Sequence, residues 1–205
     1  MIANATTPID FYFDFSSPYG YLMSEQIDAV AARHGRQVNW HPILLGVIFK
    51  STGARPPADG ASSKSTYMRH DFHRSARFLG IPYNLPSRFP LPTQNAARAY
   101  HWLFDQDTVL ARAFAHAVYR AFFVEDLDIS SPETMLKIAA KIGIDRGRLE
   151  TALQAQETRE RLKAEVDNAL RLGVFGSPHV IIDGEPFFGA DRLPQIEHWL
   201  KTGGF

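Results

Sequence analysis

Near the N-terminus of this 205-residue sequence an apolar strand runs directly into the start of a helix, which limits the folds open to the chain. Residues 9–15 alternate apolar and polar side chains, as a β-strand does. Pro18 follows, and proline suits the first turn of a helix because the N–H that it lacks would be unpaired there. Apolar residues then recur at helical spacing up to Gly35, and residues 37–45 predict a second strand. The crossover length favours parallel pairing, so the chain begins with a βαβ unit.

The middle of the sequence is predominantly helical. Residues 51–65, rich in Gly, Pro, Ser and Ala, are expected to form a loop over a cleft, and the proline-punctuated residues 81–92 a second connection. Ser131 before Pro132 is a helix start signal, and Gly143 is a stop signal. Helices are predicted over residues 66–79, 93–104, 108–123, 132–143, 145–155 and 158–172.

The C-terminal part returns to β-structure. Residues 180–182 and 186–188 flank Asp183-Gly184, which is a hairpin signal. A final helix is predicted over residues 192–201.

The order of elements, βαβ, several helices and ββα, predicts an α/β protein with a thioredoxin fold that carries an all-helical insertion. Residues 1–45 and 173–205 are expected to form a discontinuous thioredoxin-like domain, and residues 46–172 the inserted helical domain.

Ser17 occupies the position at which thioredoxin-like redox proteins carry the first cysteine of Cys-x-x-Cys. The chain has no cysteine, which excludes disulfides, cysteine ligation of zinc, a thiol nucleophile of its own and a disulfide oxidase function. A helix N-terminus offers unpaired N–H groups and partial positive charge, which favour a thiolate. A serine there can donate a hydrogen bond to a thiolate that arrives with a cofactor. The alternative is a purely structural role, in which Ser17 only caps the helix.

Two further segments should reach the same edge of such a fold. Ser177-Pro178 lies just before the third predicted strand, where a thioredoxin fold places a cis-proline. Residues 189–192 precede the last helix, whose free N–H groups suit a carboxylate. Taken singly, Ser177-Pro178 is readily explained as a turn and Asp191 as a cap.

Composition excludes several classes of protein. The 22 basic residues balance 22 acidic ones without a basic stripe, so nucleic-acid and membrane-surface partners are not expected. No histidine and carboxylate spacing predicts a metal site. Residues 1–8 lack the features of a signal peptide and no apolar run reaches the roughly 20 residues of a membrane span, so a cytoplasmic protein is expected.

Three motifs in order carry a resemblance to a known family. Residues 13–22 (FDFSSPYGYL), 173–178 (GVFGSP) and 188–193 (FGADRL) resemble the signatures of the 2-hydroxychromene-2-carboxylate isomerases and of their relatives, the kappa-class glutathione transferases. The resemblance runs from about residue 9 to residue 200.

This resemblance implies a DsbA-like fold, a homodimer, bound glutathione and a small aromatic carboxylate as substrate. It matches Ser17 to the catalytic serine that holds the glutathione sulfur as thiolate. Lys50 and Gly53 match residues near the substrate, but Ala54 stands where relatives often have asparagine. The remaining residues matched to glutathione binding are Ser177, Pro178, Gly189, Ala190, Asp191 and Arg192.

The implied activity is a glutathione-dependent isomerisation in aromatic catabolism. Two alternatives stay open: a kappa-like transferase that releases a glutathione conjugate, and a redox-inactive thioredoxin-fold binding protein. The aromatic residues that are candidates for the substrate pocket, although such residues are more often core, are Phe49, Tyr67, Phe89 and Trp102.

Overall fold

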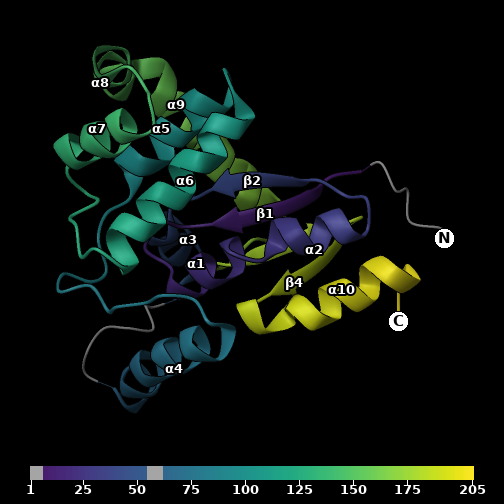
Figure 1. The fold of residues 1–205 in the computed structure, drawn as a ribbon. Coiled ribbons are helices and arrows are strands. Elements are labelled where there is room, and N and C mark those ends of the chain that lie inside the picture. The colour runs from purple at the N-terminus through teal and green to yellow at the C-terminus, as the bar shows by residue number, and fades with distance from the viewer. Residues whose placement is uncertain (1–6, 55–61) are drawn as a thin grey trace.

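The computed structural model describes residues 7–54 and 62–205 (Figure 1). Its centre is a four-stranded sheet in the order β2-β1-β3-β4. β1 pairs in parallel with β2, while β3 is antiparallel to both β1 and β4. The strands are β1 (Ile9–Phe13), β2 (Val38–Pro42), β3 (His179–Ile182) and β4 (Glu185–Phe188). The predicted βαβ and ββα halves of a thioredoxin fold are confirmed.

Helices cover both faces of this sheet. In Figure 1 a further group of helices lies above the sheet, and α4 lies below it. They are α1 (Pro18–Ser24), α2 (Ile27–Arg33), α3 (Leu45–Thr52), α4 (Ser63–Leu79), α5 (Gln94–Phe104), α6 (Thr108–Phe123), α7 (Pro132–Lys141), α8 (Arg146–Gln154), α9 (Gln156–Arg171) and α10 (Leu193–Thr202), with a 3₁₀ turn η1 (Ala190–Arg192) before α10.

The larger core joins the sheet to the helical insertion. Phe13 of β1 is fully buried, and its ring centroid lies 6.0 Å from that of Tyr100 on α5 and 5.7 Å from that of Tyr119 on α6. On the opposite face of the sheet, Tyr12 packs in a smaller cluster that includes Val166 of α9. Both faces of β1 are therefore buried. This packing fixes the position of the end of β1, after which Ser17 caps α1.

Two predicted elements differ from the structure. The single helix expected from Pro18 to Gly35 is divided into α1 and α2, because Gln26 leaves helical geometry with φ −130° and ψ −34°. Residues 45–52 form α3, where the sequence predicted the end of a strand at residue 45 and the start of a loop at residue 51. The Leu45 N–H at the start of this helix donates to the Asp14 carboxylate at 2.7 Å. Of the predicted loop at residues 51–65, residues 55–61 lie outside the described residues, whereas residues 51–52 end α3 and residues 63–65 begin α4.

Candidate functional site

Ser17 lies between α1 and the segment before β3. Its Oγ accepts a hydrogen bond from the Gly20 N–H at 3.0 Å, so Ser17 is the N-cap of α1. The same hydroxyl donates to the main-chain oxygen of Ser177 at 3.0 Å. Ser17 is 5% exposed and lines a large cavity. The structural and the functional interpretations therefore hold together: Ser17 caps the helix and also lines a cavity.

The second predicted segment lies where the sequence placed it. The Ser177-Pro178 peptide bond is cis, as predicted. Ser177 Oγ accepts a hydrogen bond from the Asp14 N–H at 3.0 Å, which ties this segment to the end of β1. The Gly189 N–H donates to the Pro178 oxygen at 3.1 Å, so the third segment begins directly beside the second. All three segments line the same cavity.

Gly20 sets the close approach of α1 to its neighbours. A Cβ atom at this position would lie 2.8 Å from Tyr119 Oη and 2.9 Å from Ser177 Oγ. Tyr119 is fully buried and donates to the Asp14 main-chain oxygen at 3.1 Å. A side chain larger than hydrogen at position 20 would push α1 away from Ser177.

Asp14 is a buried residue of the site for which the sequence analysis proposed no role. Its Oδ1 accepts from the Ser16 N–H, the Ser16 hydroxyl and the Thr93 hydroxyl at 2.7, 2.8 and 3.1 Å, and its Oδ2 from Leu45. Burial raises the pKa of the Asp14 carboxyl, and these donors act against that shift. The signal in the sequence was an acidic residue at the end of an apolar strand. A carboxylate buried there needs hydrogen-bond donors around it, which indicates a structured site.

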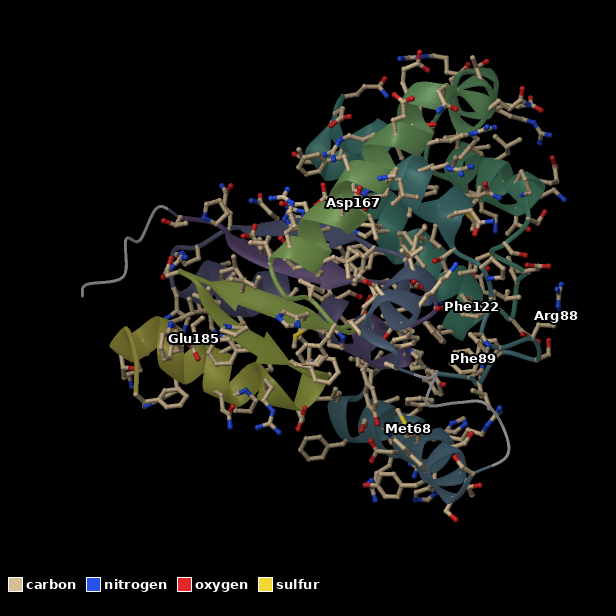
Figure 2. The ribbon with its side chains drawn as sticks, turned by 180° about the vertical axis from the view of Figure 1, so that it is seen from behind. Met68, Arg88, Phe89, Phe122, Asp167 and Glu185 are labelled. Carbon is tan, nitrogen blue, oxygen red and sulfur yellow. The ribbon has the colours of Figure 1, made fainter. Side chains whose placement is uncertain are left out.

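A cavity of about 1820 Å³ extends from Ser17 over α3, α4 and residues 89–94. Ligand pockets commonly measure roughly 300–1,000 Å³, so this one has room for two small molecules. Figure 2 shows Met68 on α4 and Phe89 on the connection to α5, and both line the cavity. Of the predicted pocket aromatics, Phe49, Tyr67 and Phe89 line it, whereas Trp102 lies on α5 outside it.

The two residues matched to substrate binding lie elsewhere. Lys50, in the last turn of α3, and Gly53, which ends that helix with φ +73°, are both exposed and do not line the cavity. Ala54 does line it, as does Lys64 in the first turn of α4. The substrate role of Lys50 and Gly53 stays a prediction.

Tyr19 connects α1 to α4 across the cavity wall. Its hydroxyl donates a short hydrogen bond to Asp71, and its ring centroid lies 5.0 Å from that of Phe72. Burial and this hydrogen bond raise the pKa of Tyr19. Although burial opposes the change, hydrogen bonds from Tyr19 and Arg74 lower the pKa of Asp71. The hydrogen bond between the Tyr19 phenol and the Asp71 carboxylate thus holds α4 against α1, the helix that Ser17 caps.

Among residues 7–54 and 62–205, no helix is both long and apolar enough to cross a bilayer. In the same part of the chain, no three histidine or carboxylate side chains gather as a metal ion would require.

Comparison with known families agrees with this fold. The family model for the DSBA-like thioredoxin domain matches residues 8–201. The chain belongs to this DSBA-like family. The predicted DsbA-like fold is therefore confirmed for almost the whole sequence.

Within the DSBA-like family, the chain is similar to enzymes of two names. A 2-hydroxychromene-2-carboxylate isomerase of Sphingobium xenophagum is 29% identical over 95% of this chain and 98% of the relative. Human glutathione S-transferase kappa 1 is 25% identical over 94% of this chain and 90% of the relative. A solved structure of a 2-hydroxychromene-2-carboxylate isomerase matches with a TM-score of 0.85 at 25% identity, covering 95% of both chains. The resemblance inferred from the three motifs is confirmed.

Proposed function

We propose that this protein is a glutathione-dependent isomerase of 2-hydroxychromene-2-carboxylate-type aromatic acids, acting in the catabolism of aromatic compounds. The observation that carries the proposal is Ser17, a residue 5% exposed that caps α1 and lines a large cavity, in a chain without cysteine. The similarity to isomerases over nearly the whole chain supports the same reaction class.

The residues of the site fit glutathione. Ser17 supplies a hydroxyl and the helix N-terminus a partial positive charge for a thiolate. Ser177 and Pro178 offer main-chain groups for a cysteinyl backbone, and residues 189–192 would hold the γ-glutamyl end. The kappa-class relatives, which are glutathione transferases by name, support this choice of cofactor.

When bound, glutathione supplies a thiolate whose reversible addition turns a conjugated carbon–carbon bond into a single bond that can rotate. Ser17 would orient that sulfur and keep it ionised by donating a hydrogen bond to the thiolate. The walls formed by α3 and α4 would hold the aromatic ring and exclude water. Glutathione would leave each cycle unchanged, which distinguishes a cofactor from a substrate.

A transferase is the second candidate, favoured by the similarity to human glutathione S-transferase kappa 1. It would use the same Ser17 and the same cavity but release a conjugate. The two functions differ in whether glutathione is consumed.

The test follows ring opening of a hydroxychromene carboxylate with substoichiometric glutathione. Many turnovers per glutathione are expected, with a rate that rises with pH because the bound thiol ionises with an apparent pKa below the roughly 8.5 of free cysteine. One conjugate per glutathione would establish the transferase instead. Full activity without any thiol would reject both, and absence of glutathione binding in calorimetry would favour a redox-inactive binding protein.

The homodimer implied by the resemblance stays a prediction, which the mass measured by light scattering during gel filtration would test.

A further inference from the structure

The proposed substrate class carries a carboxylate, and a cation in the cavity would suit it. A carboxylate that leaves water loses hydration, which only a paired positive charge or several donors can replace. The cationic side chains that line the cavity, in the part of the chain that the structure describes, lie on α2, α4 and η1.

Most of these cations already contact a carboxylate. These pairs are Arg33 with Glu197 at 2.8 Å, Arg74 with Asp71, and Arg192 with Asp191 at 2.7 Å. Lys64 is the lining cation that, among residues 7–54 and 62–205, has no such partner. The charge of Lys64 is therefore available to a ligand without breaking an existing ion pair.

Lys64 shares one face of α4 with apolar and aromatic side chains. Residues spaced by three, four, seven, eight and eleven positions lie on one side of a helix. The residues of α4 with this spacing that line the cavity are Lys64, Tyr67, Met68, Asp71, Phe72 and Ser75. A ring beside Met68 and Phe72 would thus have its carboxylate within reach of the lysine at the start of the same face.

The orientation of α4 separates this charge from the segment proposed for glutathione. Lys64 and Phe78 both line the cavity near opposite ends of α4. They are fourteen residues apart, which is roughly 21 Å along a helix. Figure 1 shows α4 beginning at its end away from α10, the helix that follows residues 189–192. Lys64 is the second residue of α4. Tyr19 holds the middle of α4 against α1 through Asp71. The cavity therefore has room along α4 for a second ligand beside glutathione.

We propose that Lys64 binds the carboxylate of the aromatic acid, and that the α4 face carrying Met68 and Phe72 contacts its ring. This assignment rests on the proposed function and deepens it, because it names the substrate-binding group of that site. It differs from the substrate role predicted for Lys50, which lies on α3 outside the cavity.

The test is calorimetric titration of the glutathione-loaded protein with chromone-2-carboxylate and with neutral chromone, which differ only in the carboxylate. Lys64→Ala is expected to weaken binding of chromone-2-carboxylate about tenfold, the size of one charge-assisted hydrogen bond, and to leave chromone unaffected. Lys64→Arg should retain most of the affinity. Arg77→Ala is the matched control, because it removes an exposed positive charge from α4 at a position that does not line the cavity.

The outcomes separate this inference from the proposed function. A wild-type preference for chromone-2-carboxylate that survives Lys64→Ala would overturn the role of Lys64 and leave the isomerase standing. Loss of that preference in Lys50→Ala alone would assign the carboxylate to Lys50. A wild-type protein that binds both probes equally would reject a carboxylate subsite, and turnover with substoichiometric glutathione would then test the isomerase by itself.

Discussion

The Ser17 hydroxyl donates a hydrogen bond to the main-chain oxygen of Ser177, 160 residues further along the chain, at 3.0 Å. A hydroxyl has one proton and makes one well-aligned hydrogen bond as a donor. A thiolate that accepts this hydrogen bond must therefore compete with the Ser177 carbonyl. The competing carbonyl keeps the hydroxyl aimed at the place where the two segments meet. Ligand binding at this site should therefore exchange one acceptor for another without reorganising α1.

Ser17→Ala should lower turnover by about 10²-fold or more, because one preorganised hydrogen bond to a developing anion contributes roughly 3 kcal/mol. The loss of the helix cap should cost about 1 kcal/mol of unfolding free energy, and the fold should persist. Steady-state kinetics and urea unfolding measure the two effects separately.

Ser16→Ala is the control for Ser17. The Ser16 hydroxyl is directed at the Asp14 carboxylate at 2.8 Å, so its removal should affect turnover far less. An equal loss of activity in both variants would show that the wrong serine has been assigned.

Gly20→Ala should weaken glutathione binding and destabilise the protein, because its Cβ would lie within 2.9 Å of Tyr119 Oη and Ser177 Oγ. Alanine is otherwise the better helix former by about 1 kcal/mol. Gly46→Ala on α3 is the matched control, since a Cβ there meets no atom within 4 Å. Thermal unfolding with and without glutathione distinguishes the two variants, and equal behaviour would mean that α1 tolerates displacement.

Much of this site followed from local sequence. Pro18 and the apolar alternation of residues 9–15 indicated the strand and helix that present Ser17, and the hairpin signal at Asp183-Gly184 located the last two strands. These features depend on neighbours in the chain, which is why periodicity and turn chemistry predict them.

What could not be predicted depends on contacts between distant segments. α3 begins where Asp14 accepts the Leu45 N–H, a contact across 31 residues, so the local pattern of residues 37–45 predicted a longer strand. The position of Lys64 in the cavity likewise depends on the contact of Tyr19 with Asp71, 52 residues away. No periodicity within one segment carries such information.

Asp14→Asn should destabilise the protein by about 3 kcal/mol, because an amide has one acceptor oxygen and would direct an NH₂ donor at groups that themselves donate. The measurement is the urea midpoint at constant m-value. Asp167→Asn is the control: Asp167 is half exposed on α9 (Figure 2) and its pair with Lys163 is of the surface kind that contributes little. Equal urea midpoints for Asp14→Asn and Asp167→Asn would mean that water can take over the hydrogen bonds around Asp14.

His41 should make stability depend on pH, because it joins the sheet to α9. Its Nδ1 lies 2.6 Å from Glu165 and its Nε2 lies 3.1 Å from Asp10, while the side chain is 21% exposed. Burial opposes the change, but these two carboxylates raise the pKa of His41 from 6.5 to about 9. Burial also opposes the shift at Glu165, yet hydrogen bonds from His41 and Arg161 lower its pKa from 4.5 to about 2.

The signs of these shifts define the pH window. A raised histidine pKa contributes stability that is fully present below pH 6.5 and lost as the pH rises through 9, whereas the contribution of Glu165 is present above pH 4.5 and lost as the pH falls towards 2. Between pH 6.5 and 9 the unfolding free energy of the wild type should fall by about 3 kcal/mol more than that of His41→Gln, which keeps a donor but does not titrate. Urea unfolding across this range is the measurement, with His198→Gln on the exposed side of α10 as control. Parallel pH profiles for the wild type and His41→Gln would show that the imidazole is uncharged between its two carboxylates.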